Sequence, residues 1–296
     1  MRIIANGTEL RRDTMHSVVM RNDMVPVPLT IEAEIMVDEA ISVDLKEGNT
    51  IIAGTEGHEF SIIKSISVAD NKSSYGENQR AIKIIAVLSR FKTVSFVRSM
   101  AIVKENTTLS DVYRAAGAQI TVTNDTAIGR FTCCIGESPS FYIARACQEN
   151  GGVIRWKNNK LDYFRLMDLY KQVPVLSVPD VGTVDTKSGF SERHLVPSFY
   201  SVSPSGEIIT GNKSKARSAR FVPHMNAQQL ANLTTCLIHR YTINVDYTES
   251  ICAGDIVNID NRGWFIVVTA ASVFRSGTDS SGSQQYTRIW LSSVEV

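Results

Sequence analysis

The sequence predicts a mainly β protein with an α+β insertion, in which two small antiparallel, β-barrel-like domains flank a helix-plus-hairpin domain. Three observations predict it. Apolar runs alternate with glycine turns over the first hundred residues, a capped helix and a tight hairpin lie mid-chain, and a strand meander follows near the end. At 296 residues, the chain is long enough for two or three modest cores.

The N-terminal segment, residues 1–102, is predicted to be a β-barrel-like domain. The stretch 31–35 alternates apolar and acidic residues, and the stretches 60–68 and 82–88 are rich in isoleucine and valine. Successive side chains of a strand point to opposite faces, so this pattern indicates an antiparallel sheet or small barrel. The polar run 70–79 is expected to be an exposed hairpin loop.

Residues 103–172 are predicted to be an α+β domain that opens with a short helix. The helix is expected over 107–116, because the stretch begins with hydroxyl residues and then places Leu109, Val112 and Tyr113 at helical spacing. Gly117 is a plausible stop for this helix.

A second helix and a hairpin are expected to close this domain. Ser138 is a good N-cap, Pro139 suits the first helical position, and Gly151 can take the left-handed conformation that ends a helix, so the helix should span 139–150. Alternating residues then flank the turn 157–160, whose paired asparagines tolerate the positive φ angles of a type I′ hairpin. The result is a compact helix-plus-hairpin unit.

A connector, residues 173–198, is expected before a second β-barrel-like domain at 199–296. The connector contains spread prolines and glycines and has no clear period. In the last domain, a helix over 226–237 is expected to pack across a sheet, and a meander of strands leads to a closing strand at 286–291. No appended catalytic or spike domain is expected after that strand.

Charge is balanced along the chain, with 31 lysines and arginines against 30 acidic residues. A nucleic-acid-binding or membrane-surface protein usually concentrates positive charge, so neither a sequence-specific nucleic acid nor a membrane is expected as a partner. No apolar run approaches the roughly 20 residues that cross a bilayer, and the first residues lack a signal-peptide core. We expect a soluble protein made in a cytoplasm.

The five cysteines contain no Cys-x-x-Cys pair, so neither a disulfide framework nor a zinc site is indicated. They are Cys133, Cys134, Cys147, Cys236 and Cys252. The adjacent pair should point to opposite faces of an extended strand, which argues against redox chemistry between them. Mostly buried, reduced thiols are expected.

Nucleophilic and metal chemistry have few candidates. Cys147 with His194 or His239 as base would form a nucleophilic pair, but Cys147 falls on the presumed buried face of its helix. The histidines lie far apart and form no His-x-x-x-His or Glu-x-x-His pair, so metal binding is not expected. They are His16, His58, His194, His224 and His239.

Two carboxylate pairs are candidates for the acid and base of a glycosidase, Glu137 with Asp162 and Asp255 with Asp260. They lie at turns and element ends, where acidic residues are common, and nothing distinguishes them from surface charge.

The segment 206–214 nearly spells a phosphate-binding loop, but Asn212 separates its second glycine from the lysine, so a surface loop is expected instead. The basic run at 213–220 has one aromatic neighbour, and a solvated loop is preferred to a nucleic-acid site. Its basic residues are Lys213, Lys215, Arg217 and Arg220.

The Glu-Asn-Gly-Gly helix end at 149–152, followed by a short strand, a polar turn and the Leu-Asp-Tyr-Phe strand at 161–164, resembles the middle domain of baseplate or tail hub proteins of contractile-tailed bacteriophages. That family includes the late control D proteins and the hub-like N-terminal part of type VI secretion spike proteins. The Gly-Asp turn at 254–255 and the Trp-Phe-Ile-Val strand at 264–267 are similar to the second barrel of those hubs.

This resemblance implies a structural protein of the virion tail baseplate, assembled in the bacterial host cytoplasm. It implies a homotrimer that forms a pseudo-sixfold ring between the tail tube protein and the spike protein, with the tape-measure protein as a further candidate partner. No catalytic, cofactor-binding or metal-binding residue is expected. The alternatives are a cell-wall hydrolase or peptidase with divergent catalytic residues, and a sixfold tube-initiating or distal tail protein.

Overall fold

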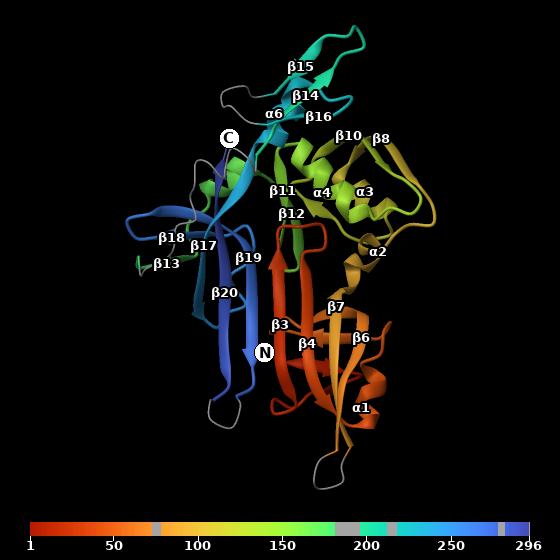
Figure 1. Ribbon diagram of the computed structural model, residues 1–296, viewed down its shortest axis with the longest axis vertical. Coiled ribbons are helices and arrows are strands. Elements are labelled where there is room, and N and C mark those ends of the chain that lie inside the picture. The colour runs from red at the N-terminus through yellow and green to blue at the C-terminus, as the bar shows by residue number, and fades with distance from the viewer. Residues whose placement is uncertain (73–77, 181–195, 212–217, 278–281, 296) are drawn as a thin grey trace.

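The computed structural model describes residues 1–72, 78–180, 196–211, 218–277 and 282–295. Figure 1 shows three levels along the longest axis: long strands at one end, a mixed α and β unit above them, and a small sheet at the other end. The mainly β class with a few small helices is confirmed. None of the described helices is long and apolar enough to cross a membrane.

The N-terminal part is a set of antiparallel strands with two short helices. Its elements are β1 (Ile3–Ala5), β2 (Thr8–Glu9), β3 (Met15–Asp23), β4 (Leu29–Val37), α1 (Glu39–Asp44), β5 (Thr50–Ala53), β6 (His58–Lys72), β7 (Asn78–Leu88), the 3-10 turn η1 (Ser89–Phe91) and α2 (Lys92–Ser95). Strands β6 and β7 extend into both ends of the predicted polar loop 70–79, so the loop was predicted too long. Its centre, 73–77, lies outside the described residues.

The middle part packs helices α3 and α4 between two small sheets. Its elements are β8 (Ile102–Thr108), α3 (Leu109–Ala115), β9 (Val122–Thr123), β10 (Ala127–Cys133), α4 (Pro139–Glu149), β11 (Gly152–Lys157), β12 (Lys160–Arg165), the 3-10 helix η2 (Leu166–Lys171) and β13 (Leu176–Val178). Strand β13 lies inside the predicted connector and pairs in parallel with β18 (Ile256–Ile259). The connector therefore contributes a strand to the C-terminal sheet.

The predicted helix-plus-hairpin unit is present within one residue of its expected bounds. Ser138 is extended at the N-cap, although its Oγ lies 2.9 Å from the Oγ of Ser140 and does not cap the helix. Gly151 has a φ of 71° after the helix. Asn158 and Asn159 have φ angles of 52° and 59°, as the type I′ turn requires.

The C-terminal part contains a small separate sheet and four long or buried strands. Its elements are β14 (Ser198–Val202), β15 (Ile208–Thr210), β16 (Ala219–Phe221), α6 (Ala227–Thr234), β17 (Cys236–Asp246), β18, β19 (Gly263–Arg275) and β20 (Gln284–Glu295). The predicted helix 226–237 is shorter, because its last residues enter β17. It packs against the small sheet of β14 and β15 and also contacts α4.

The two predicted barrel-like sets of strands share one mainly antiparallel sheet. Its long strands follow the order β17-β20-β19-β3-β4-β7-β6, and no described sheet closes into a barrel. The join is β19 with β3, where Ala271 lies opposite Arg21 and Val273 lies opposite Val19. Two buried clusters pack on this sheet: one around Ile31, which continues into the middle part as far as Tyr163, and one around Leu291.

Candidate assembly surface

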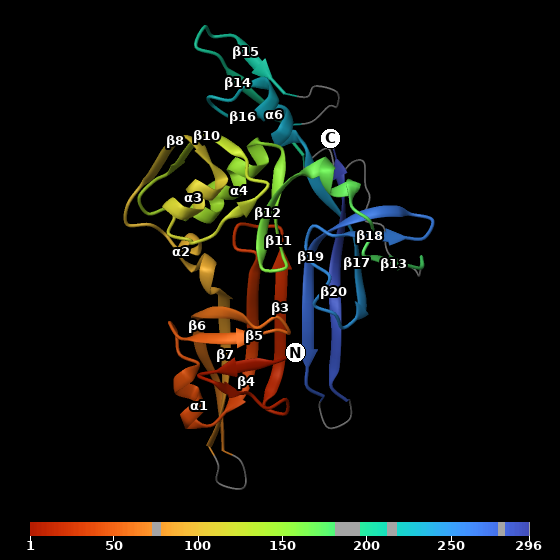
Figure 2. The same ribbon diagram turned by 180° about the vertical axis from the view of Figure 1, so that it is seen from behind.

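The long sheet has one face that carries the cores and one open face. In β3 and β4, buried residues alternate with partly or fully exposed ones, as expected for a half-buried antiparallel sheet. Figure 2 shows β5 crossing the long strands on the core side. The open face carries Ser17, Val19 and Arg21 of β3, Thr30, Glu32 and Glu34 of β4, Lys83 and Ile85 of β7, Ala271, Val273 and Arg275 of β19, and Tyr286, Arg288 and Trp290 of β20.

The C-terminal half of the open face is a shallow hollow with basic and aromatic walls. Arg21 is paired with Asp23 at 3.3 Å, and the Arg288 guanidinium lies 5.5 Å from the centre of the Tyr286 ring. Arg275 is exposed at the end of β19. This half of the face is therefore more basic than the β4 half, where Glu32 and Glu34 lie.

The two sides of the sheet are built differently. On the C-terminal side, β17 pairs with β20 from Cys236 to Asp246. On the other side, β6 pairs with β7 and, through residues 58–61, with β5, and β1 and β2 continue the sheet beyond β5.

A buried ion pair joins the middle hairpin to the C-terminal strands. Both carboxylate oxygens of Asp255, whose side chain is 1% exposed, accept hydrogen bonds of 2.7 Å from the Lys157 ammonium. Arg155 lies 3.9 Å from the same carboxylate and stacks over the Phe164 ring at 4.4 Å. The backbone N–H of Cys252 donates a third bond to Asp255. The pair holds the hairpin against the turn before β18.

Two amide side chains complete this junction. Asn22 of β3 donates to the carbonyl of Trp156 at 3.1 Å and accepts from the N–H of Ala253 at 2.9 Å. Gln172 donates to the carbonyl of Gly254 at 3.0 Å. All three parts of the chain thus meet at one polar junction. Sequence reasoning placed these residues only in turns and strands, because no local pattern links Lys157 to a residue 98 positions away.

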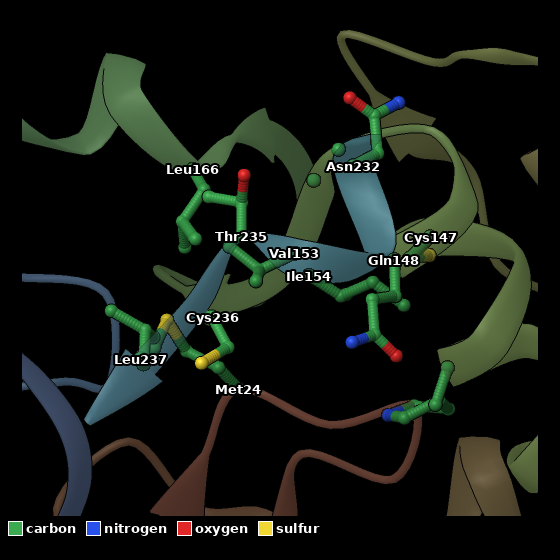
Figure 3. Close-up of a pocket in the computed structure, with 14 residues that line it drawn as sticks. Met24, Cys147, Gln148, Val153, Ile154, Leu166, Asn232, Thr235, Cys236 and Leu237 are labelled. Atoms are coloured by element: carbon green, nitrogen blue, oxygen red, sulfur yellow. The ribbon is translucent and has the colours of Figure 1, made fainter. Parts of the chain in front are cut away.

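A cavity of about 200 Å³ lies between α4 and the start of β17. Figure 3 shows Cys147 and Gln148 of α4 on one side of it, with Met24, Cys236 and Leu237 on the other. Cys147 is 3% exposed, and burial raises the pKa of its thiol to about 12. It makes no hydrogen bond to a histidine among the described residues. A thiol held protonated in this way is a poor nucleophile.

The histidines lie on separate elements. His194 is outside the described residues, His16 is in β3, His58 begins β6, His224 precedes α6, and His239 is in β17. His58 lies 3.3 Å from Glu56, and burial lowers the pKa of its imidazole. Within the described ranges, no three His, Cys, Asp or Glu side chains converge to hold a metal ion.

In each of the two candidate glycosidase pairs, the two carboxylates have different neighbours. Glu137 accepts from the N–H of Cys134 at 2.7 Å, whereas Asp162 lies 3.6 Å from Arg155. Asp255 and Asp260 lie at opposite ends of β18, so their Cα atoms are about 16 Å apart at roughly 3.3 Å per residue. That exceeds the roughly 5–9.5 Å between the carboxyl groups of glycosidases.

The near-match to a phosphate loop has a different local structure. Strand β15 runs through the middle of the segment, pairing Ile209 with Ser201, whereas a phosphate loop follows its strand. Residues 212–217, which include Lys213, Lys215 and Arg217, lie outside the described residues. Arg220 is exposed on β16.

The chain shares its fold with a phage tail protein and with a chain of a VgrG complex, so the resemblance seen in the sequence is confirmed at the level of fold. The chain is similar to the 43 kDa tail protein of prophage MuSo2 from Shewanella oneidensis, with a TM-score of 0.64, 12% identity, and 98% of this chain and 97% of that chain covered. No family profile and no curated protein sequence matches the chain.

A second similar structure is a chain of the Francisella PdpA-VgrG complex. The TM-score is 0.53 at 9% identity, and the match covers 98% of this chain and 52% of that chain. The chain therefore spans about half the length of that relative. Both structures show a common fold and nothing further about the chemistry of this chain.

Proposed function

We propose that this protein is a structural hub of a phage-type tail baseplate and that three copies form a pseudo-sixfold ring. The observation that carries the proposal is the likeness of the whole fold to a phage tail protein, which covers 98% of this chain and 97% of that chain. Different surfaces that meet head to tail between copies generate a closed ring when the rotation closes.

The pseudo-sixfold symmetry rests on the two cores of the sheet. Each copy contributes one half built on the cluster around Ile31 and one half built on the cluster around Leu291. Three copies would then present six comparable units around an axis. Such a ring fits a sixfold tail tube on one side and a threefold spike on the other, and its partners are the tube protein, the spike protein and the tape-measure protein.

The proposal is tested by the mass of the purified protein in solution. Light scattering over a wide concentration range should give three chains of 32.7 kDa at the upper end. Six chains would favour a tube-initiating or distal tail protein. A monomer at every concentration, together with release of fragments from purified cell walls, would favour the hydrolase alternative and contradict the hub.

A further inference from the structure

Two arginines stand on either side of an alanine on the open face of the sheet. Ala271 of β19 lies opposite Arg21 of β3 and opposite Arg288 of β20, and the three strands are neighbours (Figure 1). Residues directly opposite each other in neighbouring strands point to the same face of the sheet. Strands lie about 4.8 Å apart, so the Cα atoms of the two arginines are about 10 Å apart. The short side chain of Ala271 leaves no third long side chain between the two guanidinium groups.

Both guanidinium groups are held in place and keep donors to spare. Nη2 of Arg21 donates to Oδ1 of Asp23 at 3.3 Å, and Nε of Arg288 donates to Oδ1 of Asn244 at 2.9 Å. Each is the one hydrogen bond that the group makes within the part of the chain that the structure describes. A guanidinium has five N–H donors, so most of those on the two groups are available to a ligand.

The hollow around these arginines carries an excess of positive charge. It has a volume of about 510 Å³, and its walls include Arg21, Arg275 and Arg288. Among the described residues, Asp23 is the one carboxylate that pairs with any of the three. Two positive charges are therefore left without a partner charge in the hollow. This excess favours a negatively charged ligand.

The chemistry of the two guanidinium groups indicates an oxyanion. The planar fork of an arginine matches the two oxygen atoms of a carboxylate or phosphate and can donate two parallel hydrogen bonds to them. Two forks that flank one short side chain can donate to one such group from both sides. The floor and the adjoining wall of the hollow are apolar, with Val273, Tyr286 and Trp290 next to the arginines.

The rest of the open face favours a short acidic segment over a long polyanion. On β4, Glu32 lies opposite Val19 and Glu34 lies opposite Ser17, so both glutamates share the face with Arg21 one strand away. Lys83 lies 3.9 Å from Glu32, and no cation contacts Glu34 among the described residues. A nucleic acid that crossed this face would bring its phosphates against these carboxylates. A single acidic side chain flanked by apolar ones avoids them and uses the apolar wall.

We propose that Arg21 and Arg288 form an arginine clamp that binds a glutamate or aspartate side chain of a partner protein. The neighbouring side chains of that partner segment pack on Tyr286 and Trp290. The clamp lies within one chain, so this inference goes beyond the proposed hub and does not depend on the ring.

The test measures peptide binding to the full chain by fluorescence anisotropy. The probe is a short fluorescein-labelled peptide in which glutamate alternates with leucine, and the reference peptide has glutamine in place of every glutamate. Binding is measured at about 50 mM and about 300 mM sodium chloride, because salt screens exposed charges. The acidic peptide should bind more tightly than the reference, and its advantage should shrink at the higher salt concentration.

Three pairs of substitutions locate the site. Arg21→Gln with Arg288→Gln should weaken binding of the acidic peptide by about tenfold or more, as loss of a hydrogen bond to a charged group does. Arg21→Lys with Arg288→Lys keeps both charges but loses the fork, and should weaken binding by about threefold or more. The matched control is Arg114→Gln with Arg130→Gln, which removes two exposed arginines outside the hollow and should leave binding unchanged. Thermal unfolding checks that each variant is folded.

Several results would overturn the clamp. Equal binding of the two peptides, or unchanged binding by the double glutamine variant, removes the site. Equal loss in the control variant assigns the binding to net charge alone, and full binding by the double lysine variant removes the role of the fork. A thymidine oligonucleotide that binds the same arginines more tightly than the peptide would replace the protein partner with a nucleic acid.

The failures of the two proposals are distinguishable. A protein that stays monomeric but binds the acidic peptide through Arg21 and Arg288 overturns the ring and supports the clamp. A trimer that binds neither peptide overturns the clamp and leaves the ring intact.

Discussion

Removing the lysine from the buried ion pair between Lys157 and Asp255 should destabilise the whole molecule. In Lys157→Met, a carboxylate that is 1% exposed keeps only the N–H of Cys252 and the more distant Arg155. Removing one partner of a buried pair costs about 3–5 kcal/mol. Because Arg155 remains at 3.9 Å, we expect the lower end, about 3 kcal/mol of unfolding free energy.

The companion change should cost less. In Asp255→Asn, the remaining Lys157 side chain is 24% exposed and can rehydrate, so about 1–2 kcal/mol is expected. The double variant should lose less than the sum of the two, with a coupling of about 1–2 kcal/mol. Urea unfolding followed by tryptophan fluorescence measures all four proteins, since buried Trp156 is next to Lys157. Additive losses, with coupling below about 0.3 kcal/mol, would refute the account of this junction.

Three further predictions follow from the burial of single groups. Burial lowers the pKa of the His58 imidazole in the folded protein from 6.5. As the pH falls, this imidazole therefore takes up its proton in the unfolded chain before it does so in the folded one. The free energy of unfolding of the wild type should consequently fall more than that of His58→Gln between about pH 7.5 and about pH 5.5. Gly152→Ala should cost about 1–3 kcal/mol, because an added Cβ would lie 2.3 Å from the Tyr163 ring, and thermal unfolding measures the loss. A thiol reagent should modify exposed Cys134 quickly and Cys147, whose pKa is raised to about 12, only after unfolding.

Each of these predictions has a matched control. His16→Gln changes an exposed histidine and should keep the wild-type dependence on pH. Gly129→Ala adds a Cβ that meets nothing within 4 Å and should be nearly neutral, so an equal loss at both glycines would contradict the steric reasoning. Rapid modification of a thiol in Cys134→Ser, at the wild-type rate, would contradict the assignment of the reactive cysteine.

Local chemistry predicted the parts of the fold that depend on neighbouring residues. The asparagine turn at 158–159 and the glycine after α4 require particular φ angles, and both are found where the sequence places them. The alternation around Glu32 and Glu34 likewise predicted the half-buried strand β4. Such signals act over a few residues and need no knowledge of the rest of the chain.

Features that depend on distant residues were not predictable in the same way. The join between β3 and β19 pairs Arg21 with Ala271, and no local pattern identifies strands so far apart in sequence. The apolar face of helix α6 could pack against any sheet with an apolar surface. The sequence therefore does not specify that it packs on β14 and α4. The ion pair of Asp255 was hidden for the same reason, since Gly-Asp reads as an ordinary turn.

The symmetry of the assembled protein tests the central claim most directly. Class averages of negatively stained particles, prepared at the highest concentration used for light scattering, should show a threefold ring with a central channel and six similar densities around it. Particles with true sixfold symmetry, or compact particles the size of one chain without a channel, would contradict the proposed hub.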